Sequence, residues 1–203
     1  MEIAKAAIKA HGGEKFKNVK SLVFRGTGDV SISPEKTFSA PFHMIHSGDK
    51  YRLEIAAPFM EMKQVYDGDR TISSLANFKL PPLNRLGLWL LPKIEDKDFT
   101  VSPLPNKSKK LGFRITSPEG DYTDFFVDEK TMQIVGYEAK YDYNRREVKT
   151  SVSLDKLREV EGCLFPEHYS QSFDVGEYTI YAKFKAKEIL VNSFIADDVF
   201  VER

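Results

Sequence analysis

The chain has 203 residues, of which 41% are hydrophobic and 30% are charged. This size and composition indicate one globular domain over residues 1–203 and exclude a disordered chain. Thirty basic residues balance thirty acidic ones, so no general positive field favours nucleic acid or an anionic membrane. The single cysteine, Cys163, excludes an intramolecular disulfide and a cysteine-cluster zinc site.

The first ten residues have the pattern of an amphipathic helix. Its apolar residues recur at helical intervals: Ile3, Ala6, Ala7 and Ala10. Gly12 and Gly13 predict the end of the helix. His11, just before them, is interpreted as a helix-end residue whose positive charge suits the negative end of the helix dipole.

From Ser21 onward the apolar pattern has a period of two, which is typical of strands. Gly26 and Gly28 in the first strand predict a bend or a close backbone approach. Further strand pairs are predicted at residues 42–46 and 51–56, 60–66 and 71–75, 111–117 and 122–127, 133–141 and 146–154, and 168–173 and 178–187. These segments predict roughly ten or eleven strands in an antiparallel meander, and hence a mainly β (α+β) fold with a few helices.

Residues 78–105 interrupt the strand pattern. A connection of this length inside a meander is usually functional or disordered, and this one is too apolar for disorder. Residues 86–91 predict a short helix that ends at Pro92 and carries Leu86, Trp89 and Leu90. Because Gly87 weakens this helix, it can act as a mobile lid, with one side on the sheet edge and the other over a cavity. The alternative is an ordinary core helix with a buried tryptophan.

The candidate metal-binding and nucleophilic residues have simpler interpretations. His43 and His46 are three positions apart on a predicted strand, so they point to opposite faces and cannot bind one metal ion together. Cys163 has apolar neighbours and no histidine or amide placed to activate it, which favours a small buried side chain. No metal or cofactor is expected, and no nucleophile–base pair is visible.

The apolar face of the sheet is the remaining candidate site. Its large side chains are Met44, Leu53, Ile55, Met62, Tyr66, Phe113, Ile115, Tyr137, Ile180 and Phe184. For each residue taken alone, ordinary core packing is the alternative. A curved sheet with few helices cannot fill its own concavity, so the N-terminal helix, residues 86–91 or a ligand must occupy it.

Five motifs follow one another along the chain. Residues 50–58 contain an aromatic-Arg-x-Glu strand that ends at a proline, and residues 64–72 contain a strand that closes on Asp-Gly-x-x-Thr. Residues 125–134 combine a strand, an Asp-containing turn and a second strand. Residues 162–166 read Gly-x-x-Phe-Pro, and residues 192–200 read Asn-x-x-Ile-x-Asp-x-x-Phe. In this order the motifs resemble those of the LolA/LolB-type outer-membrane lipoprotein carriers, over nearly the whole chain.

The resemblance implies a curved antiparallel sheet that forms an incomplete β-barrel, covered by an N-terminal helix and a short apolar lid helix. It also implies a hydrophobic cavity for acyl chains and, for Arg52, a role in holding the lid closed. The implied partners are lipids or the acyl chains of lipoproteins and a membrane-bound delivery partner, with no nucleic acid. The implied location is the periplasm or cell envelope, although Met1 leads directly into the helical pattern with no visible signal peptide.

The function hypothesis is therefore a non-enzymatic carrier that sequesters acyl chains in a hydrophobic cavity. Two alternatives stay open: an enzyme that acts on a small apolar substrate in the same pocket, and a structural module of the envelope with no ligand. A pocket of roughly 300 Å³ would favour the carrier. The side chains expected to line it are Met44, Leu53, Met62, Tyr66 and Phe113.

Overall fold

The computed structural model describes residues 1–33, 36–57, 60–74, 86–105, 110–143, 146–174 and 179–201. Its strands in chain order are β1 (Ser21–Ser33), β2 (Lys36–Ser47), β3 (Lys50–Ala57), β4 (Met60–Tyr66), β5 (Thr71–Ser73), β6 (Thr100–Pro103), β7 (Gly112–Thr116), β8 (Tyr122–Val127), β9 (Ile134–Tyr143), β10 (Arg146–Val160), β11 (Cys163–Asp174) and β12 (Thr179–Val191). Its helices are α1 (Glu2–Ala10), α2 (Glu14–Lys17) and the 3-10 helices η2 (Gly87–Glu95) and η3 (Asp197–Phe200).

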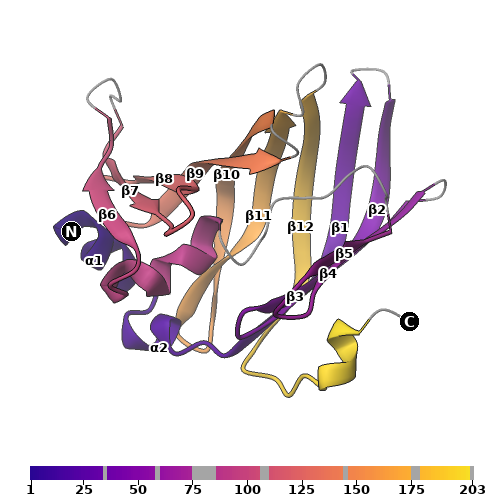
Figure 1. The fold of residues 1–203 in the computed structure, drawn as a ribbon, viewed down its shortest axis with the longest axis horizontal. Helices are drawn as coiled ribbons and strands as arrows, with labels where there is room; N and C mark the ends of the chain where they lie inside the picture. The colour runs from indigo at the N-terminus through magenta and orange to yellow at the C-terminus, as the bar shows by residue number, and fades with distance from the viewer. Residues whose placement is uncertain are drawn as a thin grey trace.

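The twelve strands of the described ranges form one curved sheet (Figure 1), with the order β5-β4-β3-β2-β1-β12-β11-β10-β9-β8-β7-β6. Each neighbouring pair is antiparallel. The chain starts in the middle of the sheet, builds one side as far as β5, crosses to β6, and returns to pair β12 with β1. Because β5 and β6 are the two edges, the barrel is incomplete, and the predicted fold class is confirmed.

Two differences from the predicted strands have local causes. Strand β6 was missed because it has only four residues, too few to show a clear alternation. Strands β10 and β11 are longer than predicted because a two-residue turn joins Val160 to Cys163. The turn residues Glu161 and Gly162 both have left-handed φ angles, 57° and 78°, as a type I′ hairpin turn requires. Glutamate is an uncommon residue at the first of these positions, so the sequence signal was weak.

Gly26 confirms the prediction of a close backbone approach in the first strand. The pairing of β1 with β12 shifts register between Arg25 and Gly26, which marks a β-bulge. A Cβ atom at Gly26 would lie 2.0 Å from the carbonyl oxygen of Lys185, so only glycine fits there.

Helix α1 is present as predicted, but its buried face differs from the expected one. Its buried residues are Ala4, Ala7 and Ile8, because this stripe faces η2 and β7. Of the expected stripe, Ala7 is buried as predicted, whereas Ile3, Ala6 and Ala10 are only partly buried. The sequence predicted the helix but could not predict the direction from which the sheet and η2 pack on it.

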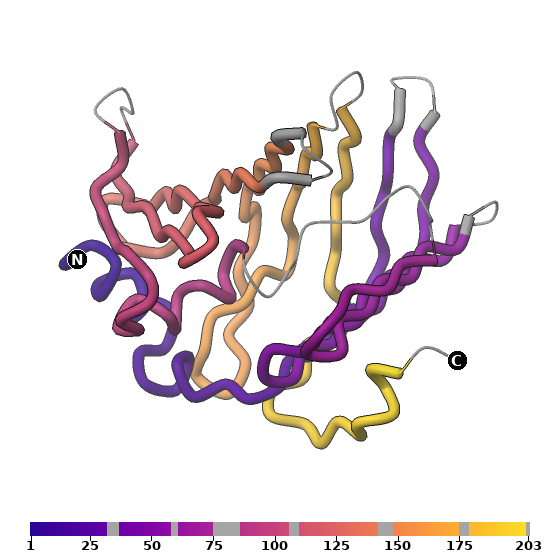
Figure 2. The backbone as a smooth tube through the Cα atoms, in the orientation of Figure 1, coloured from indigo at the N-terminus to yellow at the C-terminus, as the bar shows by residue number. Residues whose placement is uncertain are grey.

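The C-terminal segment covers part of the outer face of the sheet. After β12 the chain turns back beneath β3, at the opposite end of the molecule from α1 (Figure 2). Phe200 in η3 packs in a small outer cluster with Val23, Ile45 and Val65. The main core lies on the concave face, where α1, α2 and η2 pack. Among the residues that the structure describes, no helix combines the length and apolarity that a membrane span requires.

Candidate ligand-binding cavity

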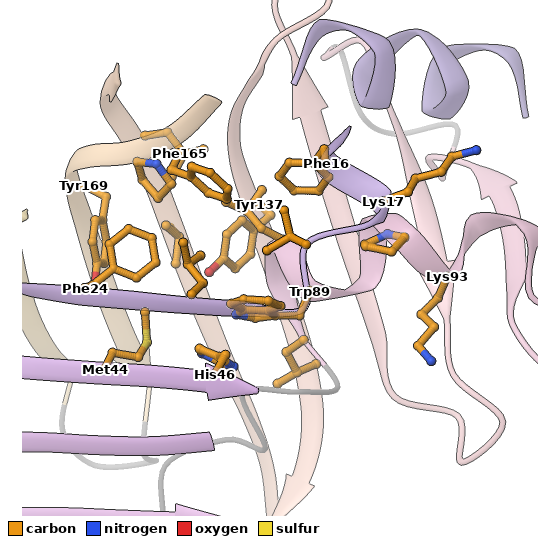
Figure 3. A pocket seen from close by; sticks show the side chains of 18 of the residues that line it. Phe16, Lys17, Phe24, Met44, His46, Trp89, Lys93, Tyr137, Phe165 and Tyr169 are labelled. Atoms are coloured by element: carbon orange, nitrogen blue, oxygen red, sulfur yellow. The ribbon is translucent and has the colours of Figure 1, made fainter. Parts of the chain in front are cut away.

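A cavity of about 270 Å³ lies on the concave face, between the middle strands of the sheet and η2 (Figure 3). Its lining is mostly apolar, and it includes residues of α2, β1, β2, η2, β9, β10 and β11. The apolar lining residues are Phe16, Val19, Leu22, Phe24, Met44, Leu86, Leu88, Trp89, Pro92, Val152, Leu154, Phe165 and Pro166, and the other side chains are Lys17, His46, Asp49, Lys93, Tyr137, Tyr169 and Gln171. The cavity has about the volume expected from the sequence.

Most of the sequence-predicted site residues lie either in the cavity lining or in the surrounding core. Those that line the cavity are Met44, Leu86, Trp89 and Tyr137. Those buried in the surrounding core are Leu53, Ile55, Met62, Leu90, Phe113, Ile115 and Phe184, and Ile180 is partly buried against it. Tyr66 stacks on Tyr51 at the side of the sheet, and its hydroxyl donates to the carbonyl oxygen of Gly68 at 2.8 Å.

The core residues were expected to line the cavity because they share the concave face with it. Phe113 and Ile115 lie on β7, which α1 covers, while Leu90 belongs to the side of η2 that faces the core. Alternation identifies the face of a strand but not the helix that packs over it. Of the five residues expected to line the pocket together, only Met44 does so.

Several lining residues were missed by sequence reasoning. Leu22 and Phe24 lie on the predicted inner face of β1, while Val152, Leu154 and Tyr169 lie on β10 and β11. Their common signal is a position on the inner face of a strand near the middle of the sheet. That signal can be used only when the strand order is known, because β1 and β11 become neighbours of β12 through the return of the chain.

Helix η2 has one side in the core and the other at the cavity. Leu90, Leu91 and Ile94 are buried in the main core, whereas Leu88 and Trp89 line the cavity. The helix does not end at Pro92, as expected, but continues to Glu95. Proline is incompatible with the interior of an α-helix, and the segment is instead a 3-10 helix. Residues 78–85 of the expected connection lie outside the described residues.

Gly87 has a different role from the one expected. Its φ angle is +68°, and a Cβ atom there would lie 2.7 Å from the hydroxyl oxygen of Tyr137. The glycine is therefore required by a left-handed conformation and by the close approach of a cavity-lining ring. Its backbone N–H donates to Oγ1 of Thr123 at 3.3 Å, which ties the start of η2 to β8.

Arg52 lies on the opposite face of the sheet from the cavity. Its Nη1 donates to the carbonyl oxygen of Val199 at 2.8 Å, and its Nε donates to Oε1 of Glu54 at 2.9 Å. The guanidinium thus fastens the C-terminal segment to β3. The expected contact with the lid is replaced by this one, because the strand phase directs Arg52 away from Tyr51 and Leu53, which are buried on the inner side.

His43 and His46 point to opposite faces of β2, as predicted. His43 accepts a hydrogen bond from Nε of Arg25 at 3.2 Å on the outer face. His46 is 1% exposed and lines the cavity, where its ring stacks on Trp89 with centroids 3.8 Å apart. Within the described ranges, no group of three or more His, Cys, Asp or Glu side chains is placed to hold a metal ion.

His46 is a neutral imidazole with one unpaired nitrogen. Its Nε2 is buried, and no group among the described residues forms a hydrogen bond with it. Burial lowers the pKa of His46 to about 3, because the charged form loses its hydration. At neutral pH the residue therefore carries no charge to the cavity wall.

His11 differs from its expected role as a charged helix end. It is fully buried, and its Nε2 accepts a hydrogen bond from the backbone N–H of Ile134 at 3.0 Å. Its proton must then be on Nδ1, which donates to the carbonyl oxygen of Leu164 at 3.0 Å. Burial lowers the pKa of His11, so the side chain is neutral and joins the end of α1 to β9 and β11.

Two tyrosines add hydroxyl groups to the cavity lining. Tyr137 on β9 pairs with Val152 on β10, and Tyr169 on β11 pairs with Leu154, so the two rings flank the same strand. Burial raises the pKa of both phenols, which stay protonated at neutral pH. Gln171 beside them donates from Nε2 to Oγ1 of Thr150 at 3.0 Å.

Two lysines bring positive charge to the α2–η2 side of the cavity. Nζ of Lys17 lies 2.9 Å from carboxylate oxygens of both Glu14 and Glu95, and this ion pair joins α2 to η2. Lys93 lies 4.0 Å from the carboxylate of Asp96 and keeps 40% of its side chain exposed. The carboxylates on Lys17 compensate its charge, whereas Lys93 is partly exposed to solvent and has the carboxylate of Asp96 beside it.

Cys163 is 2% exposed, and burial raises the pKa of its thiol. The prediction of a small buried side chain is confirmed. A thiol with a raised pKa stays protonated and is a poor nucleophile.

Comparisons with known proteins identify the fold class. No family model and no curated protein matches the sequence. Among solved structures, a LolA superfamily protein from Nitrosomonas europaea is 11% identical, with a TM-score of 0.59 over 99% of this chain and 96% of that chain. A DUF1329 family protein from Desulfovibrio piger is 10% identical, with a TM-score of 0.59 over 98% and 96%.

An outer-membrane lipoprotein-sorting protein domain from Vibrio parahaemolyticus is 8% identical, with a TM-score of 0.55 over 98% of this chain and 94% of that chain. The chain therefore has the fold of the LolA superfamily and of outer-membrane lipoprotein-sorting domains. The resemblance that the order of motifs indicated is confirmed at the level of the fold.

Proposed function

We propose that this protein is a carrier of the bacterial cell envelope that withdraws an acyl chain of a lipid or lipoprotein from water. The observation that carries the proposal is the cavity of about 270 Å³ between the concave sheet and η2, with its mostly apolar lining. Each CH₂ group that leaves water for such a lining gains about 0.8 kcal/mol. The fold supports the same function, because the solved structures that share it include a LolA superfamily protein and an outer-membrane lipoprotein-sorting protein domain. Delivery of the chain to a membrane-bound partner is part of the proposal.

The proposed role of the cavity is binding without chemistry. An efficient general base needs a pKa near the working pH, and burial holds the pKa of His46 at about 3. The phenols of Tyr137 and Tyr169 are protonated, and the Cys163 thiol lies outside the lining. These groups suit a site that binds and releases its ligand unchanged, and they argue against the alternative of an enzyme.

The proposed entry to the cavity is at η2. Leu88 and Trp89 form its inner wall, and neither belongs to the fully buried part of the helix. A displacement of these two side chains opens the cavity without breaking the core contacts of Leu90 and Leu91. Among the sequence-predicted site residues, the proposal keeps Met44, Leu86, Trp89 and Tyr137 as ligand contacts.

The test uses Trp89, the only tryptophan, as its own reporter. Protein purified without detergent is titrated with lysophosphatidylcholine, and native mass spectrometry of the same sample detects bound lipid. We expect a saturable change in tryptophan emission and a lipid adduct of defined mass. If neither a change in emission nor a lipid adduct is found at any lipid concentration, the proposed carrier role is wrong.

A matched pair of variants locates the binding. Leu88→Asp introduces a carboxylate into the cavity lining, whereas Val135→Asp introduces one at a side chain that is 44% exposed and does not line the cavity. We expect Leu88→Asp to weaken binding at least tenfold and Val135→Asp to bind as the unmodified chain does. Far-ultraviolet circular dichroism checks that both variants keep the fold. Leu90→Asp is unsuitable because Leu90 is fully buried in the core.

A further inference from the structure

Two tyrosine hydroxyls in the cavity lining have no acceptor for their protons among the described residues. Tyr137 and Tyr169 both line the cavity, and neither hydroxyl forms a hydrogen bond with any residue that the structure describes. A phenol loses free energy when an occupant of the cavity displaces the water around its hydroxyl and brings no acceptor. An occupant of the cavity that brings an oxygen acceptor would restore that loss.

Other tyrosines on the same sheet show what a hydroxyl does when the chain itself supplies a partner. The Tyr51 hydroxyl accepts a hydrogen bond from Nε2 of Gln64 at 2.8 Å, although the ring is fully buried. The Tyr66 hydroxyl donates to the carbonyl oxygen of Gly68 at 2.8 Å. By contrast, the hydroxyls of Tyr137 and Tyr169, which form no hydrogen bond with the described residues, both lie in the cavity lining.

The position of the two rings suits a single polar group. Tyr137 on β9 and Tyr169 on β11 flank β10 from its two sides. Their partners on β10 are Val152 and Leu154, two positions apart, and both tyrosines line the cavity on the concave side. Figure 3 shows their rings among the lining side chains, with Tyr137 next to Trp89. The two phenols are near enough for Tyr137 to contribute to the raised pKa of Tyr169.

The protons of the two hydroxyls, rather than the charges around the cavity, select the kind of polar group. Burial raises the pKa of both phenols, so at neutral pH each hydroxyl keeps a proton that it can donate. The lining lysines add no net positive charge, because Glu14 and Glu95 pair with Lys17 and the carboxylate of Asp96 lies 4.0 Å from Lys93. An acyl carbonyl or carboxylate oxygen fits these donors, and an ammonium group does not.

The volume limits the number of chains. Ligand pockets in proteins are typically about 300–1,000 Å³, and this cavity of about 270 Å³ lies just below that range. One chain is therefore the better fit to this cavity than several.

We propose that the cavity takes a single-chain acyl ligand whose carbonyl or carboxylate oxygen accepts hydrogen bonds from the hydroxyls of Tyr137 and Tyr169. The inference rests on the proposed carrier function and names its ligand class. It makes the two tyrosines specificity-determining residues, because they distinguish an acyl group from a plain hydrocarbon of the same length.

The experiment compares three probes of similar length: decanoic acid, methyl decanoate and undecane. Binding is followed by Trp89 emission for the unmodified protein, Tyr137→Phe, Tyr169→Phe and the double variant. Tyr181→Phe is the control, because Tyr181 is 60% exposed and does not line the cavity. Each substitution removes one hydroxyl and keeps the ring. Thermal unfolding of each variant without ligand checks that the fold is retained, and the single variants are read by themselves if the double variant unfolds.

We expect each cavity variant to bind decanoic acid and methyl decanoate about three- to tenfold more weakly, and to bind undecane as well as before. A loss for both oxygenated probes assigns acids and esters, and a loss for decanoic acid alone assigns free acids. If the oxygenated probes bind equally well to the unmodified protein and the cavity variants, the inference is wrong while the carrier proposal stands. If no probe binds at all, undecane included, the carrier proposal itself fails.

Discussion

The regions around His11 and His46 each bury an imidazole ring, but they differ in how the ring nitrogens are hydrogen-bonded. Each contains an imidazole that is 1% exposed or less, and burial keeps both imidazoles neutral. Both nitrogens of His11 are hydrogen-bonded to the backbone of two different strands. His46 has an unpaired Nε2 and a stacking contact with Trp89 instead.

The difference indicates which buried polar groups serve the fold. His11 satisfies a backbone N–H at the start of β9 and a carbonyl oxygen on β11, so its removal leaves both unpaired. His46 satisfies no such group, and it lies where the sheet borders the cavity. A buried polar side chain with full hydrogen bonding is part of the framework, whereas an unpaired one at a cavity is a candidate ligand contact.

The largest expected effect is from His11→Ala. The substitution leaves the N–H of Ile134 and the carbonyl of Leu164 without partners and opens a void beside Phe16. We expect the free energy of unfolding to fall by roughly 3 kcal/mol. Urea denaturation measures it. His43→Ala is the control, because His43 is only partly buried on the outer face and its loss costs less than about 1 kcal/mol. Equal losses for the two variants would contradict the framework role of His11.

An intermediate effect is the acid sensitivity of stability. Both histidines have folded-state pKa values below the ordinary value of 6.5, so below that pH the unfolded chain binds more protons than the folded chain. The free energy of unfolding therefore falls as the pH falls below 6.5. Each excluded proton contributes a slope of up to about 1.4 kcal/mol per pH unit.

Urea unfolding between pH 6.5 and 5 isolates this contribution, because carboxylates titrate mainly below that window. We expect the free energy of unfolding of His46→Phe to depend less steeply on pH, by the contribution of one proton. The reason is that burial lowers the pKa of His46 to about 3, so the folded chain does not protonate it within this window. An unchanged slope in His46→Phe would show that His46 takes up its proton in the folded chain and is not a neutral wall residue.

The smallest expected effect is that of His46→Phe on stability at pH 8. Phenylalanine keeps a ring against Trp89 and removes a buried nitrogen that has no partner among the described residues. We expect the free energy of unfolding to change by less than about 1 kcal/mol, and an increase is compatible with the removal of an unpaired polar atom. Urea denaturation is again the measurement. A loss as large as that of His11→Ala would mean that His46 also belongs to the framework, and would remove the contrast between the two regions.

The sequence by itself determined the local structure of this protein and the order of its elements. Period-two alternation predicted eleven of the twelve described strands, and Gly26 predicted the close approach to β12. These features depend on residues close together in the chain, where alternation and glycine conformations act directly. The order of motifs along the chain also indicated the LolA-type fold.

Only the tertiary structure decided which inner-face residues meet the cavity. Met44 and Phe113 have the same pattern in sequence, yet Met44 lines the cavity and Phe113 is buried in the core. The charged helix-end role predicted for His11 was wrong, and the cavity position of His46 was not predicted, because their partners, Leu164 and Trp89, are distant in sequence. Burial against a helix, pairing with a distant backbone group and exposure to a void depend on how α1 and η2 pack on the sheet. Periodicity along one strand carries no record of that packing.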